Sequence, residues 1–78
     1  MALYRFYFLD DDGEVHDIRA VEARKDSVAI EQADQLLAMK SDHVAIEIWR
    51  TQGFVKGVRR DGTRYDRAPI HIDPRDQR

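Results

Sequence analysis

The 78-residue sequence contains no cysteine, and it has only two prolines and four glycines. Without cysteine, disulfide bonds, thiolate metal sites and cysteine catalysis are excluded. A chain this short that has no covalent staple buries only a small core. Both prolines, Pro69 and Pro74, lie near the C-terminal end. Together with the polar residues around them, they indicate a loosely held tail.

Long apolar runs are also missing. No segment approaches the roughly 20 consecutive apolar residues that a membrane helix needs. The first residues lack the basic region, apolar stretch and small-residue cleavage site of a signal peptide. Together with the absence of cysteine, these features predict a protein of the bacterial cytoplasm.

Charge of a single sign is not in excess. Charged residues make up 36% of the chain and the net charge is −2. This balance is typical of a mixed, hydrated surface without a general attraction to nucleic acid or acidic lipid. Residues 59–78 are the exception, since they contain six Arg and four Asp and carry a net +2.

The sequence does contain alternating apolar patterns typical of strands. Residues 3–9 predict an aromatic strand with Tyr4, Phe6 and Phe8 on one face. Residues 14–21 predict a weaker strand, and residues 43–50 predict the best one, with Val44, Ile46 and Ile48 facing the core. The return strand is expected at residues 54–59, after a hairpin loop at residues 51–53. Asp61-Gly62 predicts a further turn, after which residues 63–66 extend the sheet briefly.

A helix is predicted from Asp26-Ser27, either of which suits the N-cap, to about residue 39 or 40. The element order is therefore β-β-α-β-β. It predicts an α+β fold in which one helix packs on a four-stranded, mainly antiparallel sheet. We expect residues 1–67 to form a single domain. Residues 68–78 then form a loosely ordered polar tail, in which residues 70–72 could add a short edge strand.

The Asp10-Asp11-Asp12-Gly13 run invites comparison with a calcium loop. If Gly13 is the loop glycine, Phe8 and Arg19 occupy the first and twelfth ligand positions, so two ligands are lost. The flanking segments also predict strands, whereas that loop lies between helices. We therefore interpret the run as a hairpin turn in which the aspartates bond the local backbone and Gly13 adopts positive φ.

No other pattern of catalytic or ligand-binding residues is present. The three histidines, His16, His43 and His71, show no metal-binding spacing, and as isolated residues near strand ends they are expected on the surface. No nucleophile motif or phosphate-binding loop occurs. An enzyme would require a buried cluster such as His16, Asp17 and His43. We therefore expect no catalytic residue, no metal and no cofactor, and hence no enzyme.

One helix covers only one face of a sheet. The first strand is nevertheless apolar on both faces, and Trp49 lies opposite the core face of its strand. An apolar patch on the uncovered face favours a partner, although the C-terminal tail folding back over the face is the alternative. The sequence thus predicts a small protein-interaction module that forms a homodimer or binds another protein. The interface residues expected are Leu3, Tyr7, Leu9 and Trp49.

A second hypothesis concerns a basic segment at residues 56–67. Arginines interleaved with Phe54 and Tyr65 could hold single-stranded nucleic acid. Asp61 and Asp66 interrupt the run, however, and a charged edge strand explains the same residues. The candidate nucleic-acid contacts are Lys56, Arg59, Arg60, Arg64 and Arg67.

Three segments, YRFYFLDDDG, SVAIEQADQLLA and AIEIWR, resemble a family of short bacterial domain-of-unknown-function proteins, mostly alphaproteobacterial. The resemblance covers about residues 3–58 and implies a fold and an origin without catalytic residues. A weaker similarity is to HicB-like antitoxin domains, which also combine an aromatic strand, a D-x-x-G turn and an Ala/Leu-rich helix. Those domains usually place a further strand before the helix, where this chain has ARK at residues 23–25.

Overall fold

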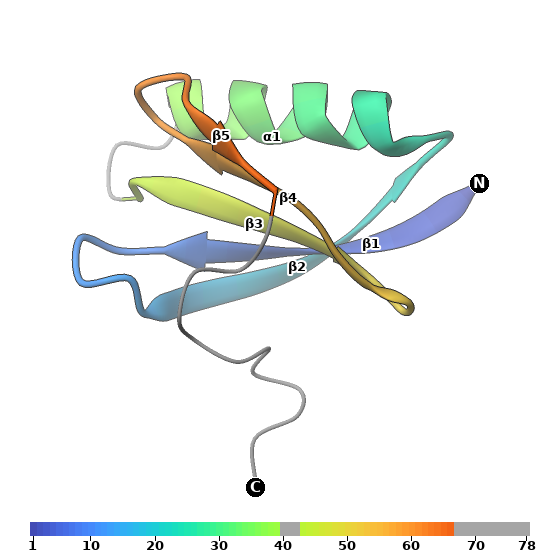
Figure 1. Cartoon of the computed structure of the whole chain (residues 1–78), viewed down its shortest axis with the longest axis horizontal. Helices are drawn as coiled ribbons and strands as arrows, with labels where there is room; N and C mark the ends of the chain where they lie inside the picture. The colour runs from blue at the N-terminus through green and yellow to red at the C-terminus, as the bar shows by residue number, and fades with distance from the viewer. Residues whose placement is uncertain (40–42, 67–78) are drawn as a thin grey trace, which may run out of the picture.

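The computed structural model describes residues 1–39 and 43–66 of the chain. One helix lies on one side of a sheet (Figure 1), so the predicted α+β class is confirmed. The predicted number of strands was too low, because the sheet contains five strands within the described residues. The elements are β1 (Ala2–Leu9), β2 (Val15–Ala23), α1 (Asp26–Met39), β3 (Ala45–Arg50), β4 (Gly53–Arg59) and β5 (Arg64–Tyr65).

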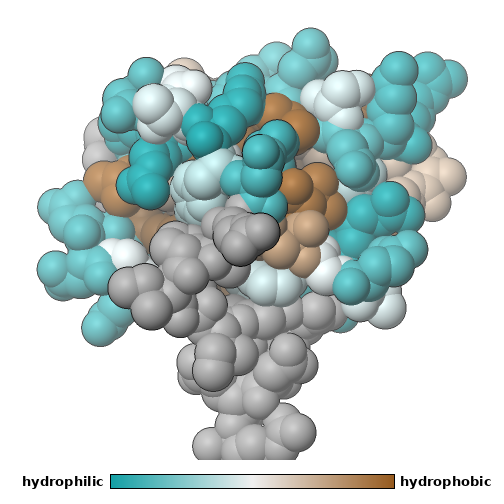
Figure 2. Space-filling view, in the orientation of Figure 1, coloured by the Kyte–Doolittle hydropathy of each residue, from teal (hydrophilic) through white to brown (hydrophobic). Residues whose placement is uncertain are grey.

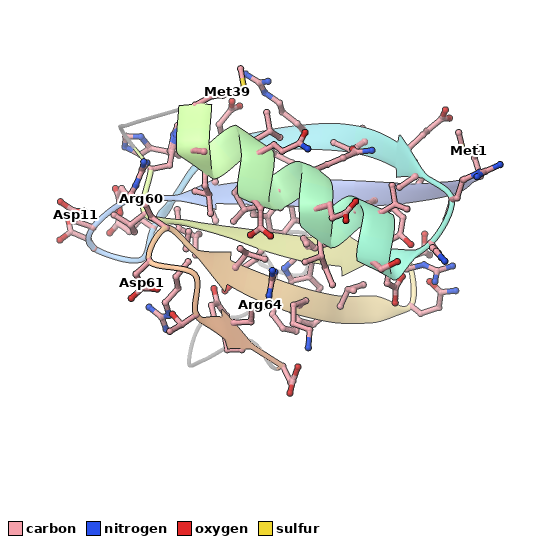
Figure 3. All side chains as sticks on the ribbon, turned by 90° about the horizontal axis from the view of Figure 1, so that it is seen from above. Met1, Asp11, Met39, Arg60, Asp61 and Arg64 are labelled. Carbon is pink, nitrogen blue, oxygen red and sulfur yellow. The ribbon has the colours of Figure 1, made fainter. Side chains whose placement is uncertain are left out.

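The strands follow the spatial order β2-β1-β3-β4-β5, and every described pair is antiparallel. The two hairpins therefore meet at the centre of the sheet, where β1 pairs with β3. α1 connects β2 to β3 and crosses the sheet obliquely (Figure 3). This arrangement leaves β2 at one edge of the described sheet and the two-residue β5 at the other.

The hydrophobic core lies between α1 and one face of the sheet. Tyr4, Phe6 and Phe8 all belong to it and have no exposed surface, which confirms the face predicted for them. The same cluster contains Ile46 and Ile48, the predicted core face of β3. The helix contributes Ala29, Ala33 and Leu37, and two small residues on this stripe allow its backbone to approach the strands closely.

The residues between β1 and β2 form a hairpin turn, as predicted. Asp10 Oδ1 accepts hydrogen bonds from the backbone N–H groups of Asp12 (2.9 Å) and Glu14 (3.0 Å). Gly13 adopts φ 80°, a conformation that glycine enters without steric cost. A bulge follows, since Phe8 lies opposite Asp17 whereas Leu9 lies opposite Val15. The extra residue, His16, shifts the side-chain alternation of β2, which simple periodicity did not predict.

The fifth strand follows the predicted Asp61-Gly62 turn. Asp61 Oδ1 accepts from both the backbone N–H (2.9 Å) and the hydroxyl (2.6 Å) of Thr63, and Gly62 adopts φ 95°. The chain then reverses and Tyr65 pairs with Gly57 of β4. The predicted tail at residues 68–78 and the short strand at residues 70–72 lie outside the described residues.

The helix begins at Asp26, as predicted, although its start is built differently. The Lys25 carbonyl accepts from the N–H groups of Val28 and Ala29, which places Lys25 at the N-cap. The assignment of the cap to Asp26 or Ser27 was therefore wrong, because both residues already lie inside the helix. Asp26 Oδ1 accepts a hydrogen bond from the Tyr4 hydroxyl at 2.6 Å. Burial is the main cause that raises the pKa of Tyr4, and this hydrogen bond raises it further. The carboxylate thereby attaches the first turn of α1 to β1.

Candidate functional site

The predicted interface residues lie on the face of the sheet opposite α1, and they differ in exposure. Leu3 is 54% exposed, whereas Tyr7, Leu9 and Trp49 are buried, with 0%, 4% and 8% of their surface accessible. Ile18, which lies opposite Tyr7 in the pairing of β1 with β2, is 50% exposed. The accessible apolar surface on this face comes from Leu3 and Ile18. The interface of four predicted residues stays a prediction.

A buried glutamate lies at the centre of this face. Glu47 is fully buried, and each of its carboxylate oxygens accepts a hydrogen bond. The Trp49 indole N–H donates to Oε1 (3.3 Å) and the Tyr65 hydroxyl donates to Oε2 (3.1 Å). A buried carboxylate requires such partners. Sequence alternation placed Glu47 on the outer face correctly but gave no sign that it is buried.

Tyr65 reaches Glu47 because the residue beneath it is glycine. A Cβ atom on Gly57 would overlap the Tyr65 ring, so the glycine leaves the space that the ring occupies on β4. The ring also stacks on Phe54 with centroids 5.9 Å apart, and the Arg59 guanidinium lies 4.8 Å from its centroid. Burial and the neighbouring Glu47 carboxylate raise the pKa of the Tyr65 hydroxyl. The group is therefore a fixed donor that attaches β5 to the sheet.

Four of the five predicted nucleic-acid contacts are described, and each of the four contacts a group within the chain. Lys56 pairs with Asp66, and Arg64 pairs with Asp34 at 2.7 Å. Arg59 covers the Tyr65 ring. Arg67 lies outside the described residues. Because these cations already have partners, none of the described contacts favours nucleic-acid binding, and this hypothesis stays a prediction.

The remaining cation of the segment, Arg60, contacts the end of the helix. Its guanidinium donates to the Leu37 carbonyl (2.9 Å) and to the His43 carbonyl. The last turn of α1 contains no basic residue, so Arg60 binds a helix-terminal carbonyl from across the structure. Figure 3 shows Arg60 at the same end of the molecule as Met39. Sequence reasoning assigned Arg60 to a nucleic-acid surface and missed this role.

Two histidines lie together near the turn. The rings of His16 and His43 are 5.9 Å apart, and His16 Nε2 lies 3.4 Å from Asp10 Oδ2. His43 is buried against Phe8, so the expectation of a surface residue was wrong; the Phe8 ring provides an apolar neighbour at the strand end.

Asp17 is the third residue of the cluster that an enzyme would require. Its carboxylate accepts the Ile18 N–H and pairs with Arg19. Within the described ranges, no three ligating side chains are grouped to hold a metal.

Two adjacent hollows of about 420 and 430 Å³ lie beside the first turn of α1. Both are lined by Asp26 and Arg50, which pair with each other across 3.6 Å. The Arg50 guanidinium also lies over the Tyr4 ring. The ion pair and the stacked guanidinium thus attach the first turn of α1 to the strands.

The free edge of β2 differs from these internally satisfied regions. β2 spans nine residues and, within residues 1–39 and 43–66, pairs only with β1. Figure 3 shows it as the outermost strand at one side of the sheet. Its residues from His16 to Glu22 are mostly exposed or half-buried. An edge of this kind presents backbone donors and acceptors to which another strand can pair.

Comparisons with protein families, with curated proteins and with solved structures find no match for the chain. In the described part of the chain, α1 is too short and too polar to cross a membrane.

Proposed function

We propose that the chain is a small, non-enzymatic protein-interaction module that self-associates along the β2 side of its sheet. The observation that supports this proposal is the long outer edge of β2, to which no strand pairs within residues 1–39 and 43–66. Unpaired N–H and C=O groups along a strand can extend a sheet into a second chain. The other edge of the described sheet ends in β5, which has only two residues and offers a much shorter ladder.

The apolar side chains near this edge support the same surface. Ile18 on β2 and Leu3 on β1 are each about half exposed, and both lie on the face opposite α1. The buried Tyr7 lies directly across from Ile18. A partner strand beside β2 would cover Ile18 while the backbone groups pair, which adds apolar burial to the hydrogen bonds.

Light scattering coupled to size exclusion, repeated over a range of protein concentrations, tests self-association. We expect the mean mass to rise from that of one chain toward that of two. Ile18→Lys should keep the protein monomeric, because it places a hydrated charge at the edge. Met39→Lys is the matched control: Met39 is also an exposed apolar residue, but it lies at the end of α1. A wild-type protein that stays monomeric up to millimolar concentration would contradict the proposal.

A further inference from the structure

The pairing of β1 defines which amides of β2 point outward. The Leu9 carbonyl accepts from the Val44 N–H at 3.0 Å, so the backbone N–H and C=O groups of Leu9 point toward β3. These groups alternate in direction along a strand. The backbone groups of Phe6 and Phe8 therefore point toward β2 and pair with those of Arg19 and Asp17, their partners in register.

It follows that the amides of Ile18 and Ala20 point away from the sheet. The Ile18 N–H independently supports this orientation, because it donates to Asp17 Oδ1 at 2.9 Å. The Asp17 carboxylate thus accepts the outward-pointing N–H of Ile18 at the middle of this edge. A second strand that pairs here would have to supply an acceptor in its place.

A second copy can pair with this edge in only a few symmetric ways. In an antiparallel pair, opposite residues lie on the same face of the sheet, so a two-fold axis places one residue against its own copy. An axis at Arg19 would oppose two guanidinium groups, and an axis at Asp17 would oppose two carboxylates. An axis at Ala20 would place Ile18 opposite Glu22, and an axis at Val21 would place charged residues opposite alanines, Glu22 against Ala20 and Arg19 against Ala23.

An axis at Ile18 has none of these conflicts. It places the two Ile18 side chains together, and it puts Asp17 of each copy opposite Arg19 of the other. These two groups already attract each other within one chain, where Arg19 Nε lies 3.5 Å from Asp17 Oδ2. Both side chains are nearly half exposed, so they can exchange this contact for one with the other copy.

We propose that two copies of the chain join through antiparallel β2–β2 pairing centred on Ile18, with Asp17 of each copy paired to Arg19 of the other. This inference rests on the proposed self-association and defines its geometry. The Ile18 N–H exchanges the Asp17 oxygen for the Ile18 carbonyl of the second copy. Because the axis is perpendicular to the sheet, the five strands of each copy form one continuous sheet and both helices lie on the same side.

The bulge limits how far the pairing extends. The register of β2 with β1 shifts beyond Asp17, and a bulge bends its strand and disturbs regular pairing. The new ladder is therefore centred on a few residues around Ile18. Such a small contact gives a weak dimer that exchanges with monomer as the concentration changes.

Single-cysteine variants test the register directly, because the natural chain has no cysteine. In the proposed pair, the two Cα atoms at position 18 are about 5.5 Å apart, within the disulfide range. Ala20→Cys is the matched control on the same edge and face: its two copies are about 14 Å apart. We expect Ile18→Cys to form a disulfide-linked dimer under mild oxidation much faster than Ala20→Cys. Equal or reversed rates overturn the register.

Charge reversal provides a second test that needs no crosslink. Asp17→Arg and Arg19→Asp should each abolish self-association, since like charges then face each other. An equimolar mixture of the two variants should form a mixed dimer, because both pairs become attractive. A mixture that stays monomeric overturns the proposed pairing. If wild-type protein self-associates but these tests fail, only the geometry is wrong; if wild-type protein is monomeric, the proposed function itself is wrong.

Discussion

At the scale of single residues, the most informative position is Gly57. Glycine is the only residue type that leaves room here for the Tyr65 ring on β4. The Tyr65 hydroxyl in turn donates a hydrogen bond to the buried Glu47. Three residues distant in the sequence thus depend on one missing Cβ atom. Through Tyr65, β5 is attached both to β4 and to the buried carboxylate.

Gly57→Ala should therefore lower the free energy of unfolding by about 1–3 kcal/mol, because the added methyl displaces the Tyr65 ring. Urea unfolding followed by fluorescence of the single tryptophan, Trp49, measures the change. In a Tyr65→Ala background the same glycine substitution should have a much smaller effect, since the two changes remove one contact. Additive effects of the two substitutions would show that Gly57 has another role.

Asp10 gives a prediction about pH. The N–H groups of Glu14 and Asp12, with the nearby His16 charge, hold the pKa of Asp10 below its usual value. A carboxyl group with a lowered folded-state pKa stabilises the fold above its unfolded pKa, near 4, and loses that contribution as the pH falls through the folded value. Asp10→Asn should therefore weaken the dependence of stability on pH below about pH 4.

The measurement is a series of urea midpoints from neutral to acidic pH for the wild-type protein, Asp10→Asn and Asp11→Asn. Asp11 is the control, because it lies at the exposed tip of the same turn (Figure 3). The curve for Asp11→Asn should run parallel to that of the wild-type protein in acid. If Asp10→Asn also runs parallel, the Asp10 carboxylate contributes nothing to the acid sensitivity of the fold.

At the scale of elements, α1 depends on a residue that follows β4. The segment after the helix contains no glycine at residues 40–42, although glycine ends many helices. Arg60 instead donates to the Leu37 and His43 carbonyls. A planar guanidinium can bind two carbonyls at once, whereas an ammonium group cannot reproduce this fork.

Arg60→Ala should lower the free energy of unfolding by about 1–3 kcal/mol, because charged hydrogen bonds to partly buried carbonyls are lost. Arg60→Lys should recover only part of the loss. Arg64→Ala is the control: it removes an exposed ion pair with Asp34, which contributes at most about 1 kcal/mol. Chemical denaturation compares the three. Equal effects of Arg60→Ala and Arg64→Ala would show that the contact with the helix end is unimportant.

The elements also show how far the sequence predicts the structure. Alternation in residues 3–9 and 43–50 was enough to assign the core faces of β1 and β3, because strand geometry alone determines which side chains share a face. The bulge at His16, the burial of Glu47 and the contact of Arg60 with α1 were not predicted. The bulge adds one residue to a strand, which the alternation of side chains cannot show. The burial of Glu47 and the contact of Arg60 depend on pairs of residues in different elements, and periodicity contains no information about such pairs.

At the scale of the whole molecule, many charged side chains of the described residues pair with one another. In the orientation of Figure 1, apolar side chains form only small, separate areas on a largely hydrophilic surface (Figure 2). Arg64 in the basic segment, Arg50 beside the hollows and Asp10 in the first turn each have an internal partner. In the part of the chain that the structure describes, β2 pairs only with β1, and the proposed function rests on this contrast.

Self-association of this kind makes stability depend on protein concentration. A partner that binds only the folded chain stabilises it by mass action. Above the dissociation constant, a tenfold rise in concentration adds about 1.4 kcal/mol per dimer, or about 0.7 kcal/mol per chain, and should raise the thermal midpoint by about 3–5 °C. Differential scanning fluorimetry over several concentrations measures this slope. Asp17→Arg should give a flat line, because it prevents the pairing without changing the core. A flat line for wild-type protein, or equal slopes for both proteins, would contradict a dimer formed through β2.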